Sequence, residues 1–309
     1  MRRVGLGLVL LVVAAWPSAQ AATPVLRVAY AGSMGVVMDR AAGPAFAKTH
    51  HVTYQGIGHG SYGLARLLAA GQMRADVFIA ITSGPVRLLQ QDGRVRRAVP
   101  VASTQMAISW SPHSRYAARF RAAAQGKTPW YTVLETPGLR FGRTDPKTDP
   151  QGRNTLLMLQ LAARHYRQPG LMQRIAGPPR NPRQVFTETS LLSRLEAGQI
   201  DATAGYLSAI RSHHLPALTL PPAINLGDPA RMATSYRHAG ITLADGKTLR
   251  VQPLVFYAAV LSNARHPRLA RDFIAFLRSA RGQAMLREHG YSPPHGPALN
   301  PVDKPTTSP

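Results

Sequence analysis

Short apolar runs alternate with amphipathic stretches along the chain from about residue 25 onward. The first run, Leu26–Ala31 (LRVAYA), is followed by a helical pattern over about 35–48 and by a second short run at Val52–Tyr54. Another helical stretch ends at Gly71, and a further apolar run covers about 75–81. Strands and helices that alternate in this way predict a parallel sheet covered by helices.

The rest of the chain continues the same pattern. The clearest predicted helix covers 267–289, where Phe273 and Leu277 belong to one apolar face. Further strands are predicted at 106–110, 139–142, 202–206 and 254–261, and further helices at 155–166 and 189–197. The 309 residues contain no internal repeat and no long linker. Two interleaved α/β lobes are therefore favoured over two domains in series.

The first 21 residues have the pattern of a secretory signal peptide. Two arginines precede a short apolar stretch, and Ala19-Gln20-Ala21 supplies the small residues that signal peptidase requires. The stretch is too short to span a bilayer comfortably, although a retained anchor is the alternative. We expect residues 1–21 to be cleaved off and the mature protein, from near Ala22, to be periplasmic. Because the chain has no cysteine, we expect no lipid anchor.

The composition excludes several classes of function. Lys and Arg total 37 against 14 Asp and Glu, a formal charge of +23, but the basic residues are scattered and no aromatic residues interleave with them. This pattern does not predict nucleic-acid binding, whereas a diffuse positive field would steer a small anion toward a cleft. Without cysteine there are no disulfides, thiolate metal sites or thiol nucleophiles. The histidine pairs His50-His51 and His213-His214 chelate poorly because adjacent side chains diverge, so we predict neither a metal site nor a cofactor.

Two predicted strand-to-helix turns carry the dipeptide Gly-Ser, at Gly32-Ser33 and Gly60-Ser61. A serine in such a turn can present its hydroxyl beside free backbone N–H groups at the carboxyl edge of the sheet, which suits an oxyanion. It can equally be an ordinary helix cap. The G-x-S-x-G pattern of hydrolases and the P-loop pattern are both absent at these turns. The turns therefore indicate an oxyanion site, with simple capping as the alternative.

Several segments together resemble the substrate-binding proteins of molybdate and tungstate ABC importers, in the archaeal-type branch of that family. They follow the family's order and spacing over nearly all of residues 25–293. They are Ala31-Gly32-Ser33, Gly60-Ser61 with Arg66, Ala75-Asp76-Val77, Phe141 to Pro146 followed by Asp149-Pro150-x-Gly152, Leu195 to Gly198, Ile224 to Pro229, and Leu243 to Lys247.

The resemblance implies an α/β architecture of the type II periplasmic-binding-protein fold. In this fold two α/β lobes are joined by two crossing strands, and the ligand cleft lies between them. The crossings would lie near 104–110 and 251–261. Lobe one would comprise 22–104 and 255–292, lobe two would comprise 105–254, and 293–309 would be a flexible Pro-rich tail.

The resemblance also implies a set of hydrogen-bond donors for a tetrahedral oxyanion. Such a set is required because a deprotonated dianion offers only acceptors. The donors would be the hydroxyls of Ser33 and Ser61 in lobe one, the backbone N–H of Gln151, a backbone N–H at the helix start near Glu188, and the hydroxyl of Tyr206.

Asp149 narrows the choice of anion, because a carboxylate beside a dianion is repulsive unless something compensates. Sulfate can neither donate a proton nor expand its coordination, hydrogen phosphate can donate a proton, and molybdenum or tungsten can accept a carboxylate oxygen as an additional ligand. In the family two carboxylates act in this way, and Asp149 matches one of them. Gly205 stands where the second, a glutamate, is expected, so tetrahedral or five-coordinate binding is favoured, with Asp149 as a direct contact. Arg153 departs from the family pattern as well and is a candidate to balance Asp149.

The sequence thus predicts a monomeric, non-enzymatic receptor that captures molybdate or tungstate and delivers it to a membrane ABC permease. One alternative is a receptor of the same fold for a phosphate-like oxyanion or an organic acid. Another is a serine-dependent hydrolase using Ser33 or Ser61 with Asp149, although no histidine lies at a recognisable spacing to activate the serine. The choice between molybdate and tungstate and the identity of the permease stay open.

Overall fold

The computed structural model describes residues 23–301, apart from 180, 244–245 and 247. The predicted signal peptide, three residues of the Leu243 to Lys247 motif and the end of the predicted tail lie outside these residues. Within the described ranges, no helix is both long enough and apolar enough to cross a membrane.

The first sheet contains the N-terminal strands and one strand from near the C-terminus, in the order β2-β1-β3-β11-β4. β1 is parallel to β2 and β3, whereas β11 runs antiparallel to both β3 and β4. The strands are β1 (Val25–Ala31), β2 (Thr53–His59), β3 (Val77–Ile81), β4 (Ala98–Ser103) and β11 (Val255–Val260).

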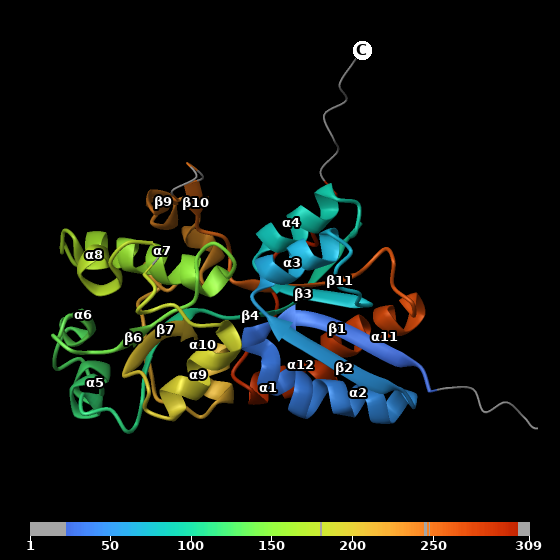
Figure 1. The fold of residues 1–309 in the computed structure, drawn as a ribbon, viewed down its shortest axis with the longest axis horizontal. Helices are drawn as coiled ribbons and strands as arrows, with labels where there is room; N and C mark the ends of the chain where they lie inside the picture. The colour runs from blue at the N-terminus through green and yellow to red at the C-terminus, as the bar shows by residue number, and fades with distance from the viewer. Residues whose placement is uncertain (1–22, 180, 244–245, 247, 302–309) are drawn as a thin grey trace, which may run out of the picture.

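Helices cover both faces of the first sheet (Figure 1). β3 shows why: Val77, Ile79 and Ile81 belong to one apolar cluster, whereas Phe78 and Ala80 belong to a second cluster on the opposite face. Successive side chains of a strand point to opposite faces, so a strand that is apolar throughout needs cover on both sides. The helical segments around this sheet are η1 (Gly32–Met34), α1 (Gly35–Val37), the π-helical η2 (Met38–Ala42), α2 (Gly43–His50), α3 (Ser61–Ala69), α4 (Ser83–Gln91), α11 (Pro267–Arg278) and α12 (Ala280–Glu288).

The second sheet has the order β6-β7-β5-β8 and is built entirely from the middle of the chain. Its strands are β5 (Met106–Trp110), β6 (Phe141–Gly142), β7 (Ala202–Tyr206) and β8 (Ala217–Thr219). A separate hairpin is formed by β9 (Gly240–Thr242) and β10 (Thr248–Arg250). The associated helices are α5 (Ala117–Ala124), α6 (Trp130–Leu134), α7 (Pro150–His165), α8 (Leu171–Ala176), α9 (Glu188–Glu196), α10 (Leu207–Ser212), η3 (Pro229–Arg231) and η4 (Tyr236–His238).

The chain passes between the two sheets twice. It leaves the first sheet after β4, forms the second sheet, and returns to the first sheet at β11, so the two halves lie side by side in Figure 1. The two connections touch each other, since the backbone N–H of Thr104 donates to the carbonyl of Leu254 at 3.0 Å. The predicted architecture, two α/β lobes with two crossings, is confirmed. The lobe boundaries at 104/105 and 254/255 stay a prediction.

Three local features differ from the sequence expectation. The helix predicted over 267–289 is two helices, because Ser279 adopts an extended backbone and its hydroxyl accepts the N–H of Gly282 as the cap of α12. The helix predicted over 35–48 is interrupted by a π-helical turn. In the predicted tail, Leu299 exchanges two backbone hydrogen bonds with Ala98 of β4, so this part of the tail is paired with the sheet.

Candidate functional site

Ser33 and Ser61 lie at the carboxyl ends of two neighbouring strands. β1 and β2 run in register, with Ala31 opposite His59, and the chain turns into a helical segment after each. Both serines are buried, and among the described residues neither Oγ has a hydrogen-bond partner. Most buried hydroxyls in proteins are paired, so two unpaired ones at the same edge of a sheet indicate a place for a ligand.

Asp149 and Gln151 are held at the start of α7. Asp149 caps the helix, and its Oδ1 accepts the backbone N–H of Gln151 at 2.7 Å. The side-chain oxygen of Gln151 accepts both the N–H and the hydroxyl of Thr144 at 2.8 Å, and its amide donates to the carbonyl of Ala204 in β7. The beginning of α7 is therefore fixed against the second sheet on two sides.

The same segment reaches across to the first lobe. The carbonyl of Thr148 accepts the N–H of Gly63, and a Cβ placed on Gly60 would lie only 2.7 Å from Oδ2 of Asp149. A side chain at position 60 would displace this carboxyl, so glycine is required there by the close approach. The carboxyl of Asp149 is thus pressed against the turn that carries Ser61.

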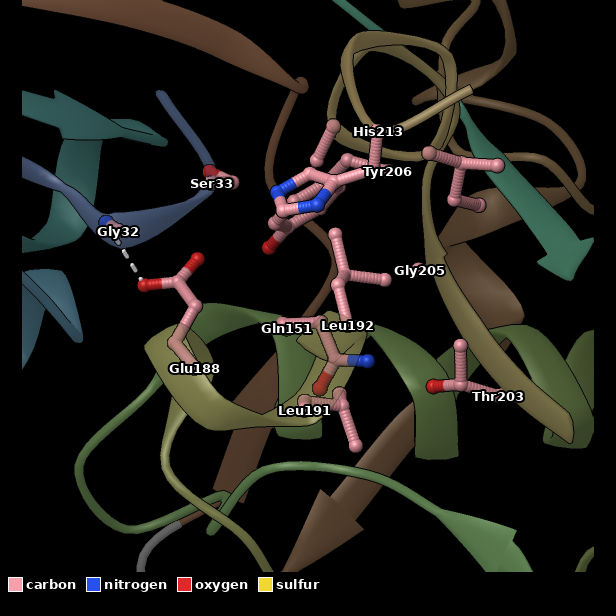
Figure 2. A pocket seen from close by; sticks show the side chains of 12 residues that line it. Gly32, Ser33, Gln151, Glu188, Leu191, Leu192, Thr203, Gly205, Tyr206 and His213 are labelled. Atoms are coloured by element: carbon pink, nitrogen blue, oxygen red, sulfur yellow. Dashed lines mark hydrogen bonds between the residues drawn. The ribbon is translucent and has the colours of Figure 1, made fainter. Parts of the chain in front are cut away.

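Glu188 begins α9 and also reaches the first lobe. Its Oε2 accepts the backbone N–H of Gly32 at 2.9 Å, although the two residues are 156 positions apart. Its Oε1 is buried and has no partner within the described part of the chain. Figure 2 shows this second oxygen directed toward the part of the cavity that Ser33 and Tyr206 line.

Tyr206 ends β7 and is fully buried. Its hydroxyl accepts a hydrogen bond from Nδ2 of Asn154 at 3.0 Å. Burial raises the pKa of Tyr206 well above the ordinary value, and the negative carboxyls of Asp149 and Glu188 raise it further. The phenol therefore keeps its proton and has it available to donate.

Ser33, Gln151, Glu188 and Tyr206 line one cavity at the junction of the two lobes, together with Gly205 and several apolar side chains of α9 and α10 (Figure 2). A Cβ built on Gly205 would meet nothing closer than 3.7 Å. Ser61 and Asp149 are not among the lining residues. Asp149 acts on Glu188, which lines the cavity, and contacts the turn at Gly60 that precedes Ser61. The structure thus brings together the six residues singled out from the sequence, while their roles as ligand contacts stay a prediction.

Two buried carboxyls at one place change each other's protonation. Burial raises the pKa of Asp149 from 3.8 to about 6, opposed by the hydrogen bond from the Gln151 N–H. Burial also raises the pKa of Glu188 well above its ordinary value, and the charge of Asp149 raises it further. Like charges in a low-dielectric site cannot both be ionised cheaply, so the pair holds a proton more readily than two exposed carboxyls would.

Residues 26–292 match the family described as bacterial extracellular solute-binding protein. The chain belongs to this family. It is 28% identical over 258 residues to the molybdate/tungstate-binding protein WtpA of Pyrococcus abyssi, an alignment that covers 77% of this chain and 74% of that protein. It is also 32% identical over 200 residues to a putative ABC transporter molybdenum-binding protein of Haloferax volcanii, covering 65% of this chain and 62% of the relative. The resemblance read from the sequence motifs is confirmed.

Solved structures show that the fold is common to receptors for different ligands. The periplasmic molybdate-binding protein of Azotobacter vinelandii superposes with a TM-score of 0.63 at 15% identity, covering 87% of this chain and all of that protein. The sulfate-binding protein SubI of Mycobacterium tuberculosis superposes with a TM-score of 0.55 at 16% identity, covering 88% of this chain and 87% of that protein. At these identities the likeness establishes the fold, and the ligand has to be argued from the site.

The guanidinium of Arg153 is held by groups other than the carboxyl of Asp149 in this solute-binding protein. Its guanidinium stacks on the ring of Tyr62 at 3.6 Å and donates to the carbonyls of Pro146 at 2.6 Å and Lys147 at 3.2 Å. Among the described residues no ion pair joins Arg153 to Asp149. The arginine holds the loop before α7 in place and acts on Asp149 only through its charge, whereas the carboxyl accepts the Gln151 N–H.

Sequence reasoning missed what the side chain of Glu188 does. It singled out this residue only for a backbone N–H, whereas the carboxyl itself lies in the site of the solute-binding protein. A contact between residues 156 positions apart leaves no local pattern. Asn154, the partner of Tyr206, was likewise not among the candidate site residues. Its position one helical turn after Pro150 is the one signal that would have placed it at the site.

Proposed function

We propose that this solute-binding protein captures molybdate or tungstate in the cavity between its two lobes and delivers it to a membrane ABC permease. The observation that carries the proposal is the pair of buried serine hydroxyls that have no partner among the described residues. One of them, Ser33, lines the same cavity as Tyr206. All three can donate, and a tetrahedral dianion needs donors on every side. Relatives named for molybdate and tungstate binding support this choice of anion.

The two carboxyls beside these donors argue against sulfate. An ionised carboxylate repels a dianion that can neither donate a proton nor accept a further ligand, and in a buried site that repulsion is strong. Selectivity would also come from cavity size, since the Mo–O and W–O bonds are longer than S–O. The two lobes would close on the anion and exclude water from it, with 22–104 and 255–292 as one lobe and 105–254 as the other.

We further propose that the protein acts as a periplasmic monomer, exported by cleavage of residues 1–21 and without a lipid anchor. It needs no cofactor and catalyses no reaction. The site disfavours the hydrolase alternative. Among the described residues no histidine is hydrogen-bonded to the Oγ of Ser33 or Ser61, although His213 lines the same cavity as Ser33. His59, next to Ser61 in sequence, instead accepts the N–H of Gly60 at 2.7 Å.

Calorimetric titration of protein purified from a periplasmic extract tests the function. Molybdate, tungstate, sulfate, phosphate and citrate are titrated in parallel, with the double variant Ser33→Ala/Ser61→Ala as the matched control. We expect one molybdate or tungstate bound per chain, no heat with sulfate, and loss of binding in the double variant. Binding of phosphate or citrate alone would assign the site to the alternative ligand class. Absence of binding by all five would overturn the function.

A further inference from the structure

The carboxyl of Glu188 joins the two lobes at the position where the anion is proposed to bind. α9 belongs with the second sheet, whereas Gly32, whose N–H Oε2 accepts, follows β1 of the first. The other oxygen, Oε1, is buried without a partner, as are the hydroxyls of Ser33 and Ser61. Three buried oxygens at one junction therefore lack partners, and only the serine hydroxyls are donors at every physiological pH.

No cation forms an ion pair with Glu188 within the described residues. On its own helix, Glu196 pairs with His213 at 2.6 Å, and Arg194 bonds Gln199. The titratable groups that face Glu188 from the neighbouring elements are Asp149 at the start of α7, Tyr206 at the end of β7, Tyr291 after α12, His59, which ends β2 and acts on Asp149, and His213 after α10, which lines the same cavity (Figure 2).

These neighbours leave the carboxyl one way to accommodate a dianion. An ionised Glu188 would oppose the bound anion, and no cation pairs with it to neutralise it. A protonated Glu188 keeps Oε2 as an acceptor for Gly32 and turns Oε1 into a donor, so that it joins the two serines. We propose that Glu188 binds the oxyanion as a neutral carboxyl that donates its proton in a hydrogen bond, so that capture of the anion requires a proton on Glu188.

The balance of the step is simple. The proton comes from solvent and binds to Oε1 of Glu188, and no bond of the anion is broken. At a pH at which Glu188 is already protonated in the free protein, binding of the anion takes up no proton. Above that pH one proton is taken up for each anion bound, so the dissociation constant rises by up to tenfold per pH unit. Burial and the charge of Asp149 hold the pKa of Glu188 above its ordinary value. The rise of the dissociation constant with pH therefore begins nearer to neutral or alkaline pH.

The inference rests on the proposed function, so its test uses molybdate on the wild-type protein and on Glu188→Gln. The amide of Gln keeps an acceptor for Gly32 and supplies a permanent donor. Dissociation constants are measured from about pH 6 to about pH 10, a range above the ordinary pKa of a carboxyl. Net proton uptake is obtained by calorimetry in two buffers of different ionisation enthalpy. Glu288→Gln, the same change at the exposed end of α12 and outside the cavity lining, is the matched control.

We expect the affinity of the wild type and of Glu288→Gln to weaken up to tenfold per pH unit in the upper part of the range, with uptake approaching one proton. Glu188→Gln should bind tightly with a flat profile. A flat wild-type profile without proton uptake, or the wild-type slope in Glu188→Gln, would overturn the inference. So would a Glu188→Gln variant that loses affinity equally at every pH, because that result indicates an ionised carboxylate on the metal.

If Glu188→Gln fails to fold, proton uptake is measured in His213→Gln, where the imidazole that lines the cavity can no longer take up the proton. If the wild type binds none of the oxyanions at any pH, the proposed function fails. If it binds them without taking up a proton, the proposed function is supported and the proposed role of Glu188 is wrong.

Discussion

Replacing Asp149 with asparagine should remove a pH-dependent cost from the folded chain. The carboxyl is buried, and its pKa rises from 3.8 to about 6 on folding. Between these two values the folded state holds more protons than the unfolded state, so stability falls as the pH rises and stays low above about pH 6. At 1.36 kcal/mol per pKa unit, the loss is about 3 kcal/mol.

Asparagine isolates the charge because it preserves the local structure. Its side-chain oxygen can still accept the N–H of Gln151, and Asn and Asp are comparable helix caps. The free energy of unfolding in urea is measured for wild type and Asp149→Asn without ligand at about pH 4 and about pH 8. The wild type should lose about 2.4 kcal/mol more than the variant over this interval, because part of the full loss has already occurred at pH 4. Removing the charge of Asp149 also brings the pKa of Glu188 closer to its ordinary value, which further reduces the loss of stability with rising pH in the variant.

The matched control is Asp228→Asn. Asp228 caps η3 with the same geometry, accepting the N–H two residues ahead at 3.0 Å, but its side chain is 38% exposed. An exposed cap has no burial cost to remove, so this variant should follow the wild-type profile. The account is refuted if Asp149→Asn and the wild type change in parallel within about 0.5 kcal/mol, the accuracy with which such differences can be compared.

Three further predictions concern single side chains. Ser33→Ala and Ser61→Ala should each weaken molybdate or tungstate binding by about 1.5–3 kcal/mol, the contribution of a hydrogen bond to a charged partner. Neither should lower the free energy of unfolding, since neither hydroxyl has a partner in the described part of the protein. Wild-type affinity in either variant would refute the site. Gly152→Ala should destabilise the chain by about 1–3 kcal/mol in urea unfolding, because the added Cβ would clash with the backbone carbonyl of Thr144. Gly205→Ala should be neutral or stabilising by up to about 1 kcal/mol, because the nearest atom to its Cβ, in Ile210, is 3.7 Å away. Ser279→Ala should lower the thermal unfolding temperature through loss of the α12 cap, about 1 kcal/mol, and an unchanged value would mean that the cap is not what starts the helix.

Local patterns made much of the fold predictable. The alternation of apolar runs and amphipathic stretches placed β1, β3, β5, β7 and β11 and most of the helices. Gly32-Ser33 and Gly60-Ser61 could be assigned to strand-to-helix turns because the carboxyl edge of a parallel sheet follows from the order of its elements. The collinear motifs then added the two crossings.

What could not be predicted depends on contacts between distant residues. The carboxyl of Glu188 reaches Gly32 only after two lobes have folded and met, and no spacing in the sequence encodes that approach. Arg153 was assigned to Asp149 by its proximity in sequence, yet the face of Tyr62 and two loop carbonyls compete for the same guanidinium. The break at Ser279 was missed because the apolar face of α11 and α12 continues across it. Caps outweigh periodicity at such points.

The position of bound tungstate is the most direct test of the central claim, which is that the anion sits between the lobes on Ser33, Ser61 and Tyr206. Tungsten scatters anomalously, so crystals grown with tungstate locate it without assumptions about the site. The account predicts one strong peak at the lobe junction, within hydrogen-bond distance of both serine hydroxyls. A peak elsewhere, for example in the basic groove lined by Arg96, Arg97, Arg271 and Arg278 on the first lobe, with none at the junction, would contradict it.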